Sequence, residues 1–226
     1  MAAPQALLPV YWHPDIALHD QAAEHVAMHP LRLSLVAEHL LRQPWALEVR
    51  PSVGASRTAL ERVHCADYLD ILQASQSLQE GRHFAFDSET RLNRHTWRAL
   101  ELSAGAWVQA TEAAYLQGVP ASFCVSYAGH HARHAHAAGF CFINGAAVAA
   151  HHALALGAQR VAVVDIDTHA GDGTVLSVLD ETRVFFGETY QPGFPGGFLS
   201  RPTRDGILRM KTESPVKFRE YWERIL

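Results

Sequence analysis

The most constraining feature of this sequence is an apolar, β-branched run, Val161 to Val164, that stops abruptly at polar residues. Asp165, Asp167 and His169 follow it at alternating positions. Such a run is typical of a strand that a parallel sheet buries on both faces. Side chains two apart point to the same side of a strand, and ligands bind at the carboxyl ends of parallel strands. We therefore expect these polar groups to converge at one edge of a sheet.

The polar residues after this strand include the side-chain types that bind divalent metals. The carboxylate of Asp167 and the imidazole of His169 can share one ion at about 2.0–2.2 Å. Gly171 and Gly173 permit backbone conformations that other residues resist, so Asp172 can fold back toward the same place. A polar turn after a strand is the alternative interpretation. We favour a metal centre, because ionisable groups are rarely gathered at the end of a buried strand without a function.

A second motif upstream supplies two adjacent histidines, His130 and His131. They can be solvated loop residues, or two imidazoles at one reaction centre, each oriented by a carboxylate that fixes its tautomer and raises its basicity. With Asp167 assigned to the metal, Asp165 and Asp172 remain as the two carboxylates. Two His–Asp pairs beside a metal are equipment for metal-assisted hydrolysis, in which the ion polarises a carbonyl and His acts as general base and acid.

At these residues the chain resembles the zinc-dependent deacetylase superfamily, which includes histone deacetylases and acetylpolyamine amidohydrolases. The motifs are Gly-His-His-Ala at 129–132, Gly-Phe-Cys-Phe-Ile-Asn at 139–144, and the segment from Asp165 to Thr174. The segments around His13 and His64 are similar too. The resemblance implies an α/β, three-layer arginase/deacetylase-like fold, with a mostly parallel sheet flanked by helices, in a single domain over residues 1–226.

The resemblance also implies a role for each motif residue. It makes Asp167 and His169 ligands of Zn²⁺ or another divalent ion, with a monovalent cation near Asp165 and Asp167. It makes His130 and His131 the acid–base pair, partnered by Asp165 and Asp172. The residues that it implies for substrate binding are Gly139, Phe140, Phe194 and Asp87. The implied substrate is acetyl-lysine in a protein, an acetylated polyamine or another small acetylated amine.

The sequence departs from the family pattern at several points. Ser126-Tyr-Ala replaces the usual Arg-Pro-Pro, Ala170 replaces a second His, and the chain reads Gly187-Glu-Thr where many members have a Ser that serves a monovalent-cation site. The downstream motifs that carry the family's third metal ligand, an Asp, and its transition-state-stabilising Tyr are not found before Leu226. We therefore expect an incomplete domain whose C-terminal strands are missing.

These departures leave two functions open besides the deacetylase. One is a catalytically inactive fragment or pseudoenzyme, because catalytic zinc normally has three protein ligands and a water. The other is an arginase-like manganese hydrolase, which shares the architecture and the Asp-x-Asp-x-His segment. The Gly-His-His and Gly-Phe-Cys motifs speak against this last alternative.

Composition excludes some partners. The net charge of −4 argues against a general nucleic-acid binder. Because no segment reaches about 18 consecutive apolar residues, we expect no membrane span. Cys65, Cys124 and Cys141 form no paired framework, so we expect a reducing, cytoplasmic environment. The N-terminus lacks the pattern of a secretory signal. An oligomer remains open.

Periodicity and turn residues predict alternating strands and helices. The expected strands are Leu8–Trp12, 119–126, 161–164, 183–187 and 206–211. A capping box at Thr58 and Glu61 predicts a helix start, and residues 81–93 are expected to form a loop. The expected helices begin at Pro30, Thr58, Asn93 or Thr96, Asn144 and Pro215, and the one that begins at Asn93 or Thr96 is expected to end at Gly118. A loop over a pocket mouth is expected at 190–202.

Overall fold

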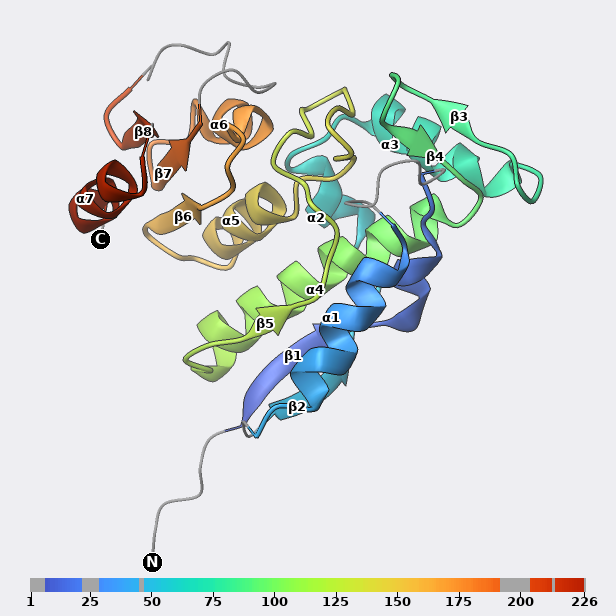
Figure 1. Cartoon of the computed structure of the whole chain (residues 1–226), viewed down its shortest axis with the longest axis horizontal. Coiled ribbons are helices and arrows are strands. Elements are labelled where there is room, and N and C mark those ends of the chain that lie inside the picture. The colour runs from blue at the N-terminus through green and yellow to red at the C-terminus, as the bar shows by residue number, and fades with distance from the viewer. Residues whose placement is uncertain (1–6, 22–28, 45–46, 192–203, 213, 226) are drawn as a thin grey trace, which may run out of the picture.

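The computed structural model describes residues 7–21, 29–44, 47–191, 204–212 and 214–225. Its strands form two separate parallel sheets, each of three strands, and a two-stranded antiparallel hairpin (Figure 1). The first parallel sheet has the order β2-β1-β5, and the second has the order β6-β7-β8. The strands are β1 (Leu8–Trp12), β2 (Leu47–Pro51), β3 (Phe84–Ala85), β4 (Arg91–Leu92), β5 (Phe123–Cys124), β6 (Val161–Asp165), β7 (Val184–Tyr190) and β8 (Ile207–Lys211).

Helices surround and connect these sheets. The longest, α4, packs against β1, β5 and α5, and α5 in turn packs against β6 (Figure 1). The helices are α1 (Leu31–Leu41), α2 (Arg57–Glu61), α3 (Ala66–Ala74), α4 (Thr96–Gln117), α5 (Gly145–Ala155), α6 (Asp172–Val178) and α7 (Pro215–Ile225), with 3₁₀ turns η1 (Pro14–Leu18) and η3 (Ser75–Ser77). The expected α/β architecture, with mostly parallel strands flanked by helices, is confirmed.

The helix ends follow the predicted signals in two cases. Asn144 caps α5, because its side-chain oxygen accepts the backbone N–H of Ala147. Gly118 ends α4 in the left-handed region, at φ 68°, where glycine has no steric penalty. The predicted capping box at Thr58 is wrong. The cap of α2 is Ser56, whose hydroxyl accepts the N–H of Ala59, so the helix begins before the predicted residue.

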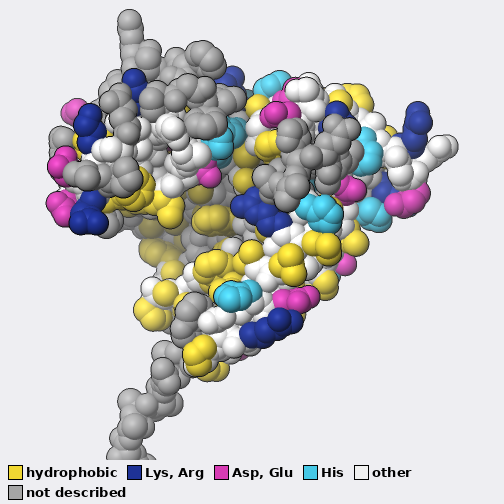
Figure 2. Space-filling model, viewed as in Figure 1, with side chains coloured by type: hydrophobic (Ala, Val, Ile, Leu, Met, Phe, Trp, Pro, Cys, Tyr) yellow, Lys and Arg dark blue, Asp and Glu magenta, His cyan; other side chains and the backbone are white. Residues whose placement is uncertain are grey.

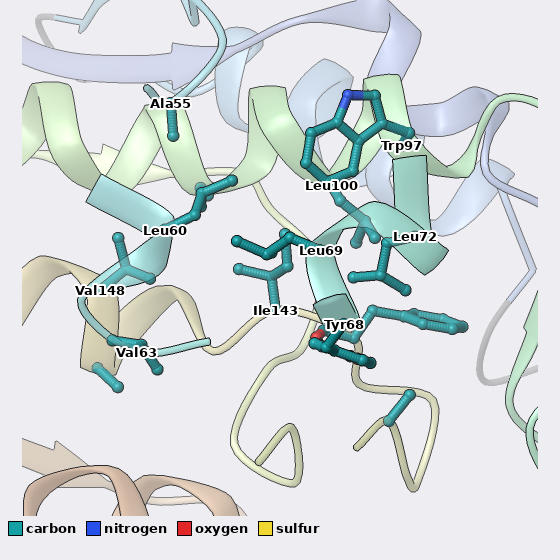
Figure 3. Packing of buried hydrophobic residues seen from close by; sticks show 14 of the residues in the cluster. Ala55, Leu60, Val63, Tyr68, Leu69, Leu72, Trp97, Leu100, Ile143 and Val148 are labelled. Atoms are coloured by element: carbon teal, nitrogen blue, oxygen red, sulfur yellow. The ribbon is translucent and has the colours of Figure 1, made fainter. Parts of the chain in front are cut away.

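The largest core lies between α2, α3, α4 and α5 (Figure 3). Leu60, Leu69 and Leu72 are fully buried there, against Trp97 and Leu100 of α4. This cluster holds the segment that carries the Gly-Phe-Cys motif, because the hydroxyl of Tyr68 donates to the Phe142 carbonyl at 2.8 Å. The core therefore fixes the backbone directly beside the predicted site.

The strand that opened the sequence analysis is present but less buried than predicted. β6 alternates half-buried and exposed residues, and Val164 is 42% exposed. The prediction of burial on both faces is wrong, because β6 is an edge strand that pairs only with β7 among the described strands. Its exposed side lines an apolar groove of about 480 Å³ with Trp107 and Tyr115 of α4. Figure 2 shows apolar side chains gathered in the recess on this face of the molecule.

Two further loop and strand predictions need correction. Residues 81–93, expected to form a loop, contain the β3–β4 hairpin, which is fixed by hydrogen bonds of the Asp87 carboxylate to the N–H groups of Glu89 and Thr90. The strand expected at 119–126 is only two residues long, Phe123–Cys124. Among the residues that the structure describes, no helix has the length and apolar character needed to cross a membrane.

Candidate active site

The two adjacent histidines lie on a loop that packs against the start of α6. The carbonyl of His130 accepts the N–H of Thr174 at 3.0 Å. A Cβ at Gly173 would collide with the carbonyl oxygen of Ala132, so only glycine permits this approach. The sequence therefore brings residues some forty positions apart into contact, with a glycine at the point of closest approach.

The first His–Asp pair is almost enclosed by protein. His131 Nδ1 lies 2.6 Å from Asp172 Oδ1, and Asp172 is 2% exposed. Arg133 donates two hydrogen bonds to the other oxygen of the same carboxylate, at 2.9 and 2.5 Å. Burial raises the pKa of Asp172, but the hydrogen bonds from His131 and Arg133 outweigh it, so the pKa falls below its ordinary value. Asp172 is thus kept ionised.

The second pair lies beside the first, with the His130 and His131 ring centroids 4.1 Å apart. His130 Nδ1 is 2.8 Å from Asp165 Oδ2, and Asp165 Oδ1 accepts the N–H of Asp167 at 3.0 Å. Burial lowers the pKa of His130, but the hydrogen bond to Asp165 and the negative charges of Asp165, Asp167 and Asp172 outweigh it and raise the pKa. Each histidine thus contacts the carboxylate with which the sequence paired it.

The predicted metal ligands also converge. Asp167 Oδ1 lies 2.8 Å from His169 Nδ1 and 4.0 Å from His130 Nε2. The His169 ring is 5.9 Å, centroid to centroid, from that of His131. Burial raises the pKa of Asp167, but the backbone and side-chain hydrogen bonds from His169 and the nearby imidazoles lower it overall. These groups therefore surround one small volume at the carboxyl end of β6.

The donor set fits a divalent ion in part. A carboxylate oxygen and an imidazole nitrogen at this separation can bind one ion from the same side. Within the described residues, however, no cluster of three or more His, Cys, Asp or Glu side chains is arranged to hold a metal. A pocket of about 240 Å³ is lined by Asp167, His130 and Asp165, with Trp107 and Val164 as further walls.

The Gly-Phe-Cys motif lies beside His131. A Cβ at Gly139, whose φ is 54°, would lie 2.5 Å from His131 Cδ2. Phe140 has the positive φ of 65°, an uncommon conformation for a bulky residue that can mark a functional constraint. Its N–H donates to Thr90 Oγ1 at 3.1 Å and its carbonyl accepts from Gln21 Nε2 at 3.2 Å, so the β4 end of the hairpin holds it in place.

The other two predicted substrate-binding residues are less informative. Asp87 is exposed and its carboxylate accepts hydrogen bonds within its own hairpin turn. Phe194, together with most of the predicted loop at 190–202, lies outside the described residues. Tyr190 belongs to β7 and not to that loop.

Sequence reasoning did not identify the roles of three charged residues at the site. Arg133 reaches Asp172 from the histidine loop, and Glu188 and Arg209 form a buried ion pair whose side chains are 1% and 3% exposed. Burial raises the pKa of Glu188, and the opposing effects of Arg209 and the N–H of Gly171 do not fully cancel that rise. The signal available in the sequence was a charged residue in the interior of each of two largely apolar strands, since buried charges are normally paired.

Comparison with known proteins agrees with the motifs. The histone deacetylase domain family matches residues 26–214 of this chain. Acetylpolyamine amidohydrolase 1 of Pseudomonas aeruginosa is 39% identical over 150 residues, covering 52% of this chain and 43% of that protein. A probable deacetylase of Archaeoglobus fulgidus is 27% identical over 195 residues, covering 83% of this chain and 52% of that protein.

The fold comparison gives the same result. The crystal structure of an acetylpolyamine aminohydrolase from Burkholderia pseudomallei matches with a TM-score of 0.79 at 26% identity, over 96% of this chain and 77% of that one. The chain spans about half the length, or less, of the two relatives described above. Because the domain match covers most of the chain, and the motifs and fold agree with it, this protein belongs to the histone deacetylase domain family, whose other members include acetylpolyamine amidohydrolases.

Proposed function

We propose that this protein is a metal-dependent amidohydrolase that removes acetyl groups from amines. The observation that carries this proposal is the pair of His–Asp hydrogen bonds, at 2.8 and 2.6 Å, side by side and adjacent to Asp167 and His169. A water placed between the two histidines and the proposed ligands, Asp167 and His169, would have a base within reach and a carbonyl-polarising ion next to it. Relatives of this chain are named as deacetylases and acetylpolyamine amidohydrolases.

In this proposal His131 is the general base. Its Nδ1 contacts an ionised carboxylate, so Nε2 is the nitrogen that accepts a proton. Arg133 keeps Asp172 ionised and oriented, which stabilises the imidazolium that forms. His130, similarly oriented by Asp165, holds the second proton that the leaving amine requires. Two neighbouring imidazoles thus remove one proton and return one.

Asp167 and His169 would hold the divalent ion, with Zn²⁺ as the proposed species. Bound there, the ion would supply Lewis acidity toward the acetyl carbonyl and acidify a water. Gly139 and Phe140 are the proposed wall of the acyl channel, because the tight approach of Gly139 to His131 leaves Phe140 next to the base. An aromatic wall fits an aliphatic amine, since each buried methylene contributes about 0.8 kcal/mol. The free cysteines are consistent with a cytoplasmic protein.

The experiment is hydrolysis of a fluorogenic acetyl-lysine peptide and of N-acetylputrescine by purified protein, with metal content measured on the same samples. We expect turnover with Zn²⁺ that chelation abolishes and added Zn²⁺ restores. His131→Ala is expected to keep its metal and lose turnover, whereas His151→Ala, on α5 and bonded to the Ser177 carbonyl, is the matched control that keeps both. Stoichiometric Zn²⁺ without turnover on either substrate would contradict catalysis by this chain.

The second candidate is an inactive chain that binds metal only. The observation that favours it is that just two metal donors meet within the described residues, whereas catalytic zinc normally has three from protein. Weak Zn²⁺ binding without hydrolysis, lost in Asp167→Ala, would support this candidate over the first.

A further inference from the structure

A row of charged residues crosses the second parallel sheet at one level. In the strand register, Asp165 of β6 pairs with Glu188 of β7, and Glu188 pairs with Arg209 of β8. In-register neighbours project on the same side of a sheet. His130 bonds to the outer end of this row, so the row consists of an imidazole, two carboxylates and a guanidinium, in that order.

The two carboxylates are close together and largely removed from water. A Cβ at Gly171 would lie 2.5 Å from Asp165 Oδ2 and 3.3 Å from Glu188 Oε2, so both acids border the same glycine. The Glu188 side chain is 1% exposed and that of Asp165 is 15% exposed. Adjacent like charges with so little solvent are unfavourable unless a cation balances them.

All four carboxylate oxygens already accept a hydrogen bond. Those of Asp165 take the N–H of Asp167 and His130 Nδ1. Those of Glu188 take the N–H of Gly171, at 2.7 Å, and Nε of Arg209. A monovalent cation beside Asp165, which the family resemblance implied, would lie next to an ion pair in which the guanidinium of Arg209 already balances Glu188, and this guanidinium would repel it. The residues present on the β7 side of Asp165 therefore do not fit such an ion.

We propose that the Glu188–Arg209 pair is a built-in replacement for a bound cation and that both are positioning residues for the segment between Asp165 and Asp172. Arg209 supplies the positive charge from within the chain. Glu188, held by Arg209, accepts a hydrogen bond from the N–H of Gly171. This hydrogen bond fixes the segment between Asp165 and Asp172. Because the segment contains Asp167 and His169, the pair sets their place. The inference rests on the proposed function only for its activity measurement.

The first experiment measures thermal stability and needs no activity. Melting temperatures are compared in potassium chloride and in choline chloride at equal ionic strength, on protein freed of divalent metal. The wild type is expected to melt at the same temperature in both salts. The double variant E188S/R209M, which removes the pair, is expected to melt about 5 °C lower in choline chloride, because the buried N–H of Gly171 loses its acceptor and the shorter Ser leaves a cavity. Potassium is expected to restore part of that loss.

The second experiment measures turnover. R209M is expected to lower kcat by about 10–100-fold with little change in KM, as is usual when a partner behind a ligand is removed. R209K keeps the charge and is expected to recover part of the rate. A purely structural role would lower the amount of folded protein equally in both variants but leave kcat per folded molecule unchanged. R183M is the matched control, because Arg183 pairs with Glu181 on the surface.

Two results would overturn the inference. One is a wild type whose melting temperature or rate rises specifically with potassium, since an ion would then bind beside Asp165 after all. The other is E188S/R209M that folds, ignores potassium and melts as the wild type does. If R209M alone does not fold, E188Q/R209M, which removes both charges and keeps the shapes, answers the same question by its response to potassium. Failure of hydrolysis in the wild type contradicts the proposed function but leaves the melting comparison valid.

Discussion

The two His–Asp pairs differ in where their positive charge lies. In the His131 pair, Arg133 binds the aspartate directly, so Asp172 has both an imidazole and a guanidinium on its two oxygens. In the His130 pair, the arginine is one carboxylate further away, and Asp165 shares its side of the sheet with Glu188. The first arrangement favours an ionised aspartate and the second favours a protonated histidine. Two similar pairs therefore differ in their electrostatics, as the two roles proposed for them require.

The largest expected effect separates the two histidines. His131→Ala should lower kcat by about 10²–10⁴-fold, because it removes the proposed base. His130→Ala should lower kcat less, since it leaves the His131–Asp172–Arg133 assembly intact. Steady-state kinetics at equal metal content measures both. If His130→Ala is as damaging as His131→Ala or more so, the assignment of base and second proton carrier is reversed.

Gly139→Ala acts on the His131 pair and leaves the contacts of the His130 pair in place. Its Cβ would lie 2.5 Å from His131 Cδ2, so the imidazole must move, and a small misplacement of a catalytic group can cost about 10²-fold. Gly118→Ala is a matched control, because Gly118 also has a positive φ, of 68°, but nothing lies within 4 Å of the added methyl. The measurement is kcat together with melting temperature. Equal loss of rate in both variants would mean that backbone strain, and not the contact with His131, is responsible.

Arg133→Met tests the direct guanidinium contact. The variant keeps much of the side-chain bulk but leaves one oxygen of Asp172 without its two donors. We expect kcat to fall about tenfold, as for other groups that orient a catalytic partner. Arg133→Lys should recover part of this loss. An unchanged kcat in Arg133→Met would show that His131 alone orients Asp172.

The smallest effect is a difference in the pH dependence of stability, measured by urea unfolding of metal-free protein. The pKa of Asp172 is lowered by folding, so its contribution is present above its ordinary value and is lost as the pH falls through the folded pKa. The pKa of His130 is raised, so its contribution is complete below about 6.5 and is lost as the pH rises through the folded pKa. The destabilisation by Asp172→Asn should thus shrink in acid, and that by His130→Gln should shrink in alkali. The same trend in both variants would contradict the comparison.

The site was predictable from sequence where its residues lie in short motifs. The alternation of Asp165, Asp167 and His169 after an apolar run, and the glycines on either side of Asp172, identified the groups that converge. The helix ends at Gly118 and Asn144 were predictable for the same reason, because caps depend on side chains and backbone within a few residues. Such local rules failed in two places. At the start of α2 the cap is Ser56 and not Thr58, and the burial of β6 depends on its position at the edge of its sheet.

The sequence by itself determined the family, the two histidines, their aspartates and the candidate ligand pair. Only the tertiary structure decided which charges support them: Arg133 on Asp172, and Glu188 with Arg209 behind Asp165. It also decided that β6 is exposed along one side and that Thr90 holds Phe140. The physical reason is the separation along the chain of the residues that interact. A motif records contacts made along the backbone, whereas electrostatic balance in a buried site depends on strand register and burial, which bring together residues far apart in the chain.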